Sequence, residues 1–191
     1  MAQFIEEYNV NDNTRILDVG GTKFNWSLVD PDPQLTLLNL TPEPERLPTN
    51  MRWCQTSGLE LPFDDDSFDI CFSNSVIEHL RDYESQQKFA AEIKRVSKKH
   101  YLQTPNYWFP IETHFITLFL HWLPKPKLKK LVRYFSVWAI LKSPSEDEVN
   151  EMVEEIRLLK PDEMKELFPK STLQYEWWLG MKKSIIMKKI K

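Results

Sequence analysis

A short apolar strand that runs into two adjacent glycines most constrains what this chain can fold into. The segment Arg15-Ile-Leu-Asp-Val-Gly-Gly-Thr-Lys-Phe-Asn-Trp26 predicts a buried strand over residues 15–19 and a tight turn at Gly20 and Gly21. Asp18 lies at the end of the strand, and the glycines let the backbone turn sharply and approach a ligand closely. The first strand of a nucleotide-binding α/β fold meets its ligand in this way, although the same residues also suit a simple tight turn.

The segments around this turn alternate between strand and helix patterns. Short apolar strands are expected over residues 34–40, 51–56, 68–73 and 100–104, and short helices over residues 2–9 and 25–29. A longer helix is expected from an N-cap at Asp82 to about residue 97, with Phe89, Ile93 and Val96 on one face. Such alternation predicts an α/β fold, in which helices cover both faces of a parallel sheet.

Residues 107–157 do not follow this alternation of strands and helices, and we interpret them as a helical insertion after the fifth strand. Residues 114–122 are apolar nearly all round, which predicts a buried helix or a lid. Residues 128–135 form an amphipathic pattern with a basic polar face, and a capping box over residues 145–148 opens an acidic helix. Because the insertion is rich in aromatic residues, we expect it to cover a ligand site.

The last segment of the chain returns to regular elements. A helix is expected from Pro161 to Phe168, and a strand over residues 173–178. A tight turn at Leu179 and Gly180 leads into a closing strand over residues 183–190, which a hairpin would make antiparallel to its neighbour. The length of 191 residues suits a single domain, residues 1–191.

Composition narrows the classes of function. The formal net charge of −3 argues against a dedicated nucleic-acid binder, and Cys54 and Cys71 form neither a CxxC motif nor a disulfide framework. Reduced thiols suit a cytoplasmic protein, and the first residues lack the pattern of a secretory leader. The acidic run over residues 64–66 is interpreted as a solvated turn, so no metal site is expected.

The stretch Leu61-Pro-Phe-Asp-Asp-Asp-Ser-Phe-Asp-Ile-Cys-Phe-Ser-Asn-Ser-Val-Ile-Glu-His-Leu80 resembles a segment of the class I S-adenosylmethionine-dependent methyltransferases. It is most similar to the small-molecule "methyltransferase type 11"-like group, which shares an "LPF…SFD…EHL" signature. The resemblance spans the first five strands, Thr104-Pro-Asn106 and the last two strands. It implies a Rossmann-like three-layer sandwich with a mostly parallel seven-stranded sheet and an antiparallel last strand.

The resemblance also implies a binding site for S-adenosylmethionine. Asp18 would order the glycine turn and contact the methionine amino group, and Asn39 stands where the family has an acid that holds the ribose hydroxyls. Thr22 and Phe24 stand where relatives have further glycines, and Ser57 matches an aspartate that faces the adenine. The implied cofactor-binding residues are Asp18, Gly20, Gly21, Thr22, Asn39, Leu40, Ser57, Gly58, Leu59, Asn74, Ser75 and Val76.

Three side chains are candidates for general acid–base catalysis, because an oxygen or nitrogen acceptor often needs a base near neutral pH. His79 follows the fourth strand, and Glu112 and His114 follow the fifth, so all three lie near the carboxyl ends of parallel strands. The alternatives are that His79 only bonds a backbone carbonyl, and that Glu112 and His114 pair structurally to fix the insertion.

The leading hypothesis is methyl transfer from S-adenosylmethionine to a small or amphipathic acceptor, with the methylated atom (oxygen, nitrogen or carbon) left open. The alternative is a binding or regulatory protein that keeps the fold without the activity, motivated by Thr22, Phe24 and Asn39. All charges over residues 124–142 are positive, which suits either a solvated face or contact with an anionic membrane. A nicotinamide-dependent oxidoreductase is disfavoured because the chain lacks GxGxxG. The oligomeric state is left open.

Overall fold

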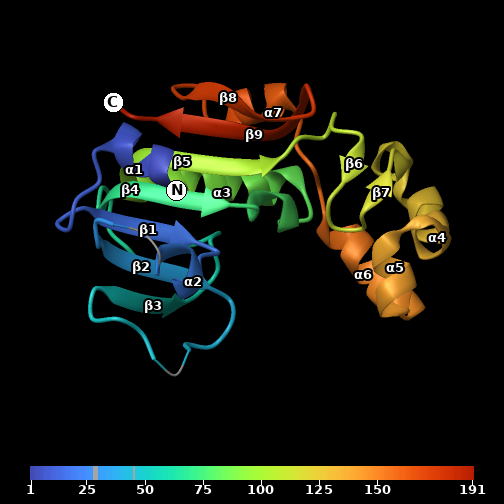
Figure 1. The fold of residues 1–191 in the computed structure, drawn as a ribbon, viewed down its shortest axis with the longest axis horizontal. Helices are drawn as coiled ribbons and strands as arrows, with labels where there is room; N and C mark the ends of the chain where they lie inside the picture. The colour runs from blue at the N-terminus through green and yellow to red at the C-terminus, as the bar shows by residue number, and fades with distance from the viewer. Residues whose placement is uncertain (28–29, 45) are drawn as a thin grey trace.

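A seven-stranded sheet forms the centre of the computed structural model, which describes residues 1–27, 30–44 and 46–191 (Figure 1). The strands, in the spatial order β3-β2-β1-β4-β5-β9-β8, are β3 Met51–Gln55, β2 Gln34–Asn39, β1 Arg15–Val19, β4 Phe68–Asn74, β5 Ser97–Pro105, β9 Met181–Lys189 and β8 Thr172–Trp178. The first five are parallel, and β9 is antiparallel to both β5 and β8. The predicted mixed sheet with an antiparallel last strand is therefore confirmed.

Helices cover the two faces of the sheet, as the alternating pattern predicts. They are α1 Ala2–Tyr8 and α2 Lys23–Trp26 on one face, and α3 Tyr83–Val96 and α7 Pro161–Leu167 on the other. Adjacent residues of β1 point to opposite faces of the sheet. Ile16 packs on the face covered by α1 and α2, and Leu17 packs on the face covered by α3 and α7. Both side chains are fully buried. The result is a three-layer arrangement with apolar packing on each side of the sheet.

The sequence predicted the ends of some helices and strands better than those of others. The Asp82 side chain accepts a hydrogen bond from the Ser85 backbone N–H at 2.8 Å, which starts α3 where the N-cap was expected. The helix expected over residues 25–29 is α2, which begins earlier and ends at Trp26, and residues 28 and 29 lie outside the described residues. Strand β5 begins at Ser97, directly after α3, so it is longer than the expected 100–104.

Residues 107–157, which we call the lobe, lie beyond the carboxyl ends of the parallel strands (Figure 1). The lobe contains β6 Ile111–Glu112, β7 Thr117–Leu118, α4 Lys125–Phe135, α5 Val137–Lys142 and α6 Glu146–Glu155, and the 3₁₀ helix Leu120–Trp122. It has its own small core around Phe115, Val132 and Val153. The predicted capping box is present, since Ser145 and Glu148 exchange hydrogen bonds at 3.2 and 2.7 Å.

The prediction of a buried helix over residues 114–122 is wrong. The segment contains the turn between β6 and β7, strand β7 and a 3₁₀ turn. Ile116 and Phe119 have positive φ angles of 52° and 62°, which end any helical run. Only Phe115 is deeply buried as an apolar anchor, whereas Leu118 is 60% exposed. The apolar side chains of residues 114–122 therefore belong to one buried residue, Phe115, and to a hairpin that is largely exposed.

Candidate functional site

A cavity of about 170 Å³ opens where β1, β2 and β4 end. Its walls consist of Val19, Gly20, Leu38, Asn39, Leu40, Thr56, Ser57, Gly58, Val76, His79, Leu80, Phe89 and Glu155. Seven of the predicted site residues line it, namely Gly20, Asn39, Leu40, Ser57, Gly58, Val76 and His79. Ligands of open α/β sheets bind at this edge, so the cavity is the candidate functional site.

Neither glycine of the turn after β1 leaves space for a side chain. Gly20 has a φ of 79°, and a Cβ there would lie 2.3 Å from the Val76 side chain. At Gly21, a Cβ would lie 2.2 Å from the Asp18 carboxyl group. The Gly20 N–H donates to the Leu38 carbonyl oxygen at 2.7 Å, which ties the turn to β2. Gly20 therefore lines the cavity and is required by packing as well as by its backbone conformation, whereas Gly21 is required by its packing against Asp18.

Asp18 lies beneath this turn and does not line the cavity. Its side chain is 2% exposed, and it accepts a hydrogen bond from Trp26 Nε1 at 2.6 Å. Burial raises the pKa of Asp18 to about 7, although the hydrogen bond from Trp26 opposes this shift. In the structure Asp18 therefore orders the turn by joining β1 to α2. Its predicted contact with a methionine amino group stays a prediction.

Asn39 joins the end of β2 to the glycine turn. Its Oδ1 accepts hydrogen bonds from the N–H groups of Leu40 at 2.8 Å and Thr41 at 3.4 Å. Its Nδ2 donates to the Gly21 carbonyl oxygen at 3.3 Å. Asn39 thus caps the strand and also lines the cavity, and an amide placed there can still offer an N–H to a ligand hydroxyl.

The opposite wall of the cavity comes from the loop after β3. Ser57 Oγ accepts a hydrogen bond from the Leu59 N–H at 3.2 Å, which holds this loop in a tight turn. A Cβ at Gly58 would lie 2.8 Å from the Phe89 ring, so α3 approaches the loop closely. Leu59 instead packs against the main core. Ser57 and Gly58 therefore face the cavity, while Leu59 supports it from behind.

Other predicted cofactor-binding residues lie outside the cavity lining. Thr22 is the exposed N-cap of α2. Ser75 has a φ of 56° and donates its N–H to the Gln103 carbonyl oxygen at 2.9 Å. Asn74 lines a separate cavity on the α1 face of the sheet, together with Asn25. Their predicted contacts with a cofactor stay predictions.

The three candidate catalytic residues meet beside the cavity. His79 comes from the 3₁₀ helix Ile77–His79 after β4, and His114 from the turn between β6 and β7. Their ring centroids lie 4.9 Å apart, with the planes at 85°. His114 Nδ1 lies 2.5 Å from Glu112 Oε1, so the expected structural pair is present. His79 Nδ1 lies 2.9 Å from Glu155 Oε1, so it bonds a carboxylate instead of the backbone carbonyl considered above.

Carboxylates set the protonation of His114. Burial acts to lower the pKa of His114, but the hydrogen bond to Glu112 and the charges of Glu112, Glu78 and Glu155 outweigh it. The pKa of His114 is therefore raised above its ordinary value, which favours the imidazolium form. The Glu112 carboxylate is itself held by the Phe115 N–H, which donates to Oε2 at 2.6 Å.

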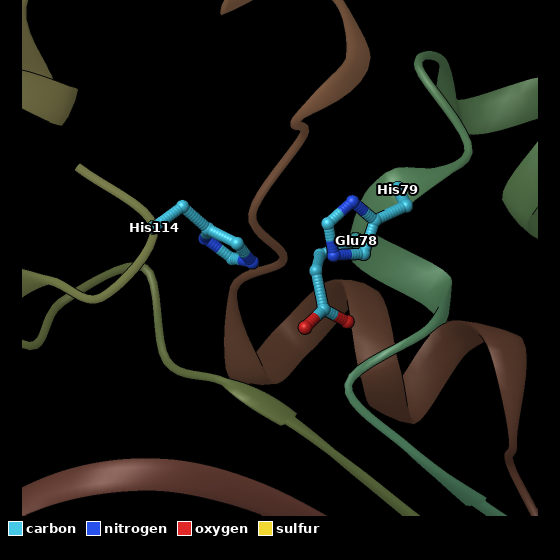
Figure 2. Close-up of side chains that lie close together, drawn as sticks. All are labelled: Glu78, His79 and His114. Atoms are coloured by element: carbon cyan, nitrogen blue, oxygen red, sulfur yellow. The ribbon is translucent and has the colours of Figure 1, made fainter. Parts of the chain in front are cut away.

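Sequence reasoning missed two acidic residues of this cluster. Glu155 reaches the cavity from the end of α6, far from His79 in the chain. Glu78 is fully buried, and its Oε2 accepts a hydrogen bond from Thr104 Oγ1 at 2.9 Å. Figure 2 shows the Glu78 carboxyl group below the two imidazole rings, and one ligand atom of each of the three residues lies within 4.8 Å of the others. The glutamate of the "EHL" signature was the available signal for Glu78, whereas Glu155 had none.

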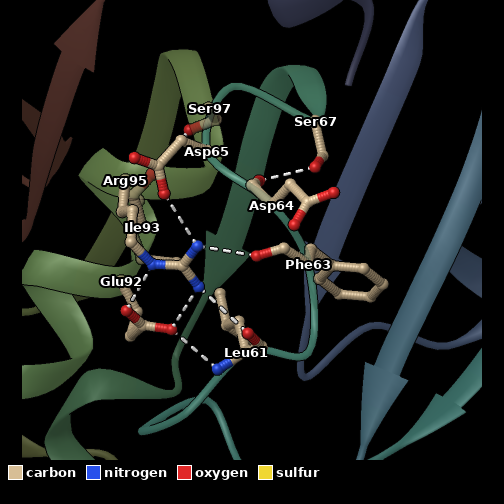
Figure 3. Close-up of polar contacts among 9 residues, drawn as sticks. All are labelled: Leu61, Phe63, Asp64, Asp65, Ser67, Glu92, Ile93, Arg95 and Ser97. Atoms are coloured by element: carbon tan, nitrogen blue, oxygen red, sulfur yellow. Dashed lines mark hydrogen bonds and ion pairs between the residues drawn. The ribbon is translucent and has the colours of Figure 1, made fainter.

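The "LPF" part of the signature has a structural role (Figure 3). The Arg95 guanidinium of α3 donates to the carbonyl oxygens of Leu61 at 3.0 Å and Phe63 at 2.6 Å. Arg95 also pairs with Asp65 at 3.0 Å and with Glu92 at 2.8 Å. The acidic turn over residues 64–66 is thus anchored to α3 through Asp65. This network places β4 and the residues after it relative to the cavity.

The part of the chain that forms most of this site matches a known family model. Residues 17–100 match the family model described as a methyltransferase domain. The matched stretch is 84 of the 191 residues, and it is similar to a methyltransferase domain. The match extends from β1 through the Leu61–Leu80 signature into β5, and the resemblance to class I S-adenosylmethionine-dependent methyltransferases is confirmed. No curated protein matches the sequence.

Solved structures share the fold of this chain. A methyltransferase from Aquifex aeolicus is 12% identical with a TM-score of 0.55, covering 98% of this chain and 87% of its own. One from Methanosarcina mazei is 16% identical with a TM-score of 0.56, covering 97% and 94%. The Burkholderia thailandensis 1,6-didemethyltoxoflavin-N1-methyltransferase, solved with its acceptor and S-adenosylhomocysteine, is 13% identical with a TM-score of 0.60, covering 98% and 74%. At these identities the likeness concerns the fold alone.

No helix in the described part of the chain has both the length and the apolar character needed to cross a lipid bilayer.

Proposed function

We propose that this protein transfers a methyl group from S-adenosylmethionine to a small or amphipathic acceptor. The observation that carries the proposal is the cavity at the ends of β1, β2 and β4, which combines the glycine turn with Asn39 and the Ser57-Gly58 turn. Apart from Glu155, the residues that line this cavity lie within the part of the chain that matches the methyltransferase domain, and His79 among them has its ring beside that of His114.

The residues present fit this cofactor. Gly20 and Gly21 keep the turn free of side chains, so backbone groups can approach the methionine part. Leu40, Val76 and Phe89 provide apolar surface for an adenine ring, and Asn39 offers an amide to the ribose hydroxyls. An amide lacks the charge-assisted hydrogen bond of a carboxylate, so we expect weaker binding than an acid at this position would support.

The protein's own residues would position the acceptor and take up its proton. The bound cofactor supplies an electrophilic methyl group that already carries its leaving group. His79 lies at the cavity rim with Nδ1 held by Glu155, which leaves Nε2 for a proton from an oxygen or nitrogen acceptor. Glu155 then stabilises the imidazolium that forms, as a carboxylate does for a catalytic histidine.

The surface of the lobe favours an amphipathic acceptor. Its exposed large apolar side chains are Trp108, Ile116, Leu118, Phe119, Trp122, Tyr134, Phe135, Val137, Ile140 and Leu141. Basic residues lie among them, and the chain carries only positive charges over residues 124–142. An apolar surface with basic neighbours suits an anionic membrane or the acyl part of a lipid-like acceptor. We propose that the lobe presents such an acceptor to the cavity from a membrane surface.

Calorimetric titration with S-adenosylmethionine and S-adenosylhomocysteine tests the proposal. We expect one saturable site for each ligand, with dissociation constants of about 1–100 µM. If neither ligand binds at about 1 mM, the proposal of methyl transfer fails. Binding of both ligands without turnover of any acceptor would instead support the alternative of an inactive binding protein.

A further inference from the structure

Glu78, His79 and His114 bring three potential metal ligands together at the junction of the core and the lobe. One oxygen of Glu78 and one nitrogen of each imidazole all lie within 4.8 Å of one another (Figure 2). Glu78 and His79 belong to the 3₁₀ helix after β4, whereas His114 comes from the β6–β7 turn of the lobe. Segments distant in the sequence therefore converge on one point.

Both histidines are held in the orientation that metal-binding histidines adopt. Glu155 Oε1 lies 2.9 Å from His79 Nδ1, and Glu112 Oε1 lies 2.5 Å from His114 Nδ1. A carboxylate at Nδ1 holds the proton there, so Nε2 is the atom that can bind a cation, which at His114 displaces the second proton of the imidazolium. The same carboxylates also make the imidazoles better ligands, because they increase the electron density of the rings.

The third ligand is a buried carboxyl group with one oxygen unused. Glu78 is fully buried, and Thr104 Oγ1 occupies only Oε2 at 2.9 Å. Within the described residues, Glu78 Oε1 has no hydrogen-bond partner. Leaving a buried carboxyl oxygen without a partner is unfavourable, and a bound cation would satisfy it.

The charges around this point favour a cation. Three carboxylates, from Glu78, Glu112 and Glu155, surround the two imidazoles. Over the described ranges, none of these carboxylates pairs with a lysine or an arginine; the pairs of Glu112 and Glu155 are the two histidines themselves. The local excess of negative charge thus lacks the basic partner that a purely structural ion-pair network would contain.

We propose that Glu78, His79 and His114 form a binding site for one divalent first-row transition-metal cation. Two imidazoles and one carboxylate suit such ions better than Mg²⁺ or Ca²⁺, which prefer oxygen ligands. Neighbouring ligand atoms around a cation bound at about 2.1 Å lie about 3 Å apart, so binding draws the three side chains together. Because His114 belongs to the lobe, the cation links the lobe to the core. The observations behind this site do not depend on the cofactor, but a cation on His79 Nε2 would take the place that the proposed methyl transfer gives to the acceptor proton.

The test is a titration of the chelator-treated, untagged full chain with Co²⁺, followed by visible absorption. We expect one equivalent to bind with d–d bands that report nitrogen and oxygen ligands, and Zn²⁺ to displace it. Hydrogen exchange of residues 107–157 should slow at least threefold when Zn²⁺ is added. This second readout reports the link between lobe and core without any enzyme activity.

Matched variants locate the site. Glu78→Gln keeps an acceptor for Thr104 and His114→Gln keeps a polar side chain, and each should weaken Co²⁺ binding at least about 100-fold. Glu112→Gln, which changes the partner of His114 Nδ1 and keeps an oxygen that can accept from the Phe115 N–H, should weaken it about 10–100-fold. His121→Gln is the control, since this lobe histidine bonds the Tyr107 carbonyl oxygen and should leave binding unchanged.

The absence of saturable Co²⁺ binding in the parent chain would overturn the proposal. So would unchanged binding in both Glu78→Gln and His114→Gln, once thermal melts in chelator show that both variants fold. Titration with S-adenosylhomocysteine on the same samples separates the two proposals. Cofactor binding without Co²⁺ binding overturns only the metal site, and Co²⁺ binding without cofactor binding overturns only the methyl transfer.

Discussion

Trp26 donates its indole hydrogen bond to the Asp18 carboxyl group at 2.6 Å, beneath the turn that shapes the candidate site. Both side chains are 2% exposed. The pair joins β1 to α2, and the Gly21 backbone lies directly against it, since a Cβ there would meet Asp18. The acid of the glycine-turn motif thus stabilises the shape of the turn from below. The raised pKa of Asp18 leads to the first prediction.

Replacing Asp18 with Asn should stabilise the ligand-free protein at alkaline pH. The folded pKa of about 7 exceeds the ordinary value of 3.8. The stability associated with this group is therefore fully present below about pH 4 and is lost as the pH rises through about 7. Asp18→Asn should gain roughly 4 kcal/mol in the free energy of unfolding at about pH 8 and almost nothing at about pH 4.

Urea denaturation at a series of pH values measures this difference, because Asn can still accept the bond from Trp26. Asp64→Asn is the control, since that carboxyl group is exposed and its replacement should change the free energy of unfolding little. An equal effect of Asp18→Asn at both ends of the pH range would contradict the prediction.

Gly20→Ala should strongly weaken cofactor binding. We expect the loss of binding free energy to exceed the loss of folding stability. Its Cβ would collide with Val76 at 2.3 Å and change the shape of the cavity. Gly180→Ala is a matched control, because Gly180 has a similar φ of 76° but a Cβ there meets nothing within 4 Å. We expect at least about a tenfold loss of S-adenosylhomocysteine affinity for the first variant and none for the second, measured by calorimetry. Equal affinities of the two variants would show that the glycine turn does not shape the site.

Phe115→Ala should loosen the lobe and leave the sheet intact. Phe115 is 1% exposed in the small core of the lobe, whereas Phe119 in the same segment is 52% exposed. Removal of a buried Phe costs about 3–5 kcal/mol, so hydrogen exchange over residues 107–157 should accelerate strongly. Phe119→Ala should change exchange little. Uniform acceleration across the sheet and the lobe would mean that the two unfold as one unit.

The lobe should bind anionic vesicles through its basic and apolar face. Lys129 already pairs with Glu154, so exposed Lys130 and Arg133 are the better charges to test. Reversal of both to Glu should weaken binding at least about tenfold, and added salt should weaken binding by the parent chain. The same reversal at Lys165 and Lys170, exposed positions outside the lobe, should have little effect in vesicle co-sedimentation. Parent-chain binding that ignores salt and lipid charge would contradict this proposal.

Much of the fold could be predicted because local signals decide it. The bounds of β1 follow from an apolar run that ends in two glycines. The starts of α3 and α6 follow from hydrogen bonds between residues three apart. The terminal hairpin follows from a tight turn between two strand patterns. In each case the interacting groups are close in the chain, so residue order alone carries the information.

The glycine turn and the positions of Asn39 and Ser57 at the cavity were likewise predictable. They follow the ends of adjacent parallel strands, which meet at one edge of a sheet. The resemblance to the methyltransferase family added what each position does in relatives. Thus the sequence by itself determined the sheet, its order of elements and the edge at which a ligand would bind.

Only the tertiary structure decided the lobe and the histidine cluster. Uniform apolarity over residues 114–122 suited a helix, but packing of Phe115 against distant lobe helices made it part of a hairpin. Glu155 reaches His79 across 76 positions of the chain, and Glu78 approaches His114 from a different element. Contacts between segments so far apart leave no periodic trace in the sequence, because they depend on how separately folded elements pack together.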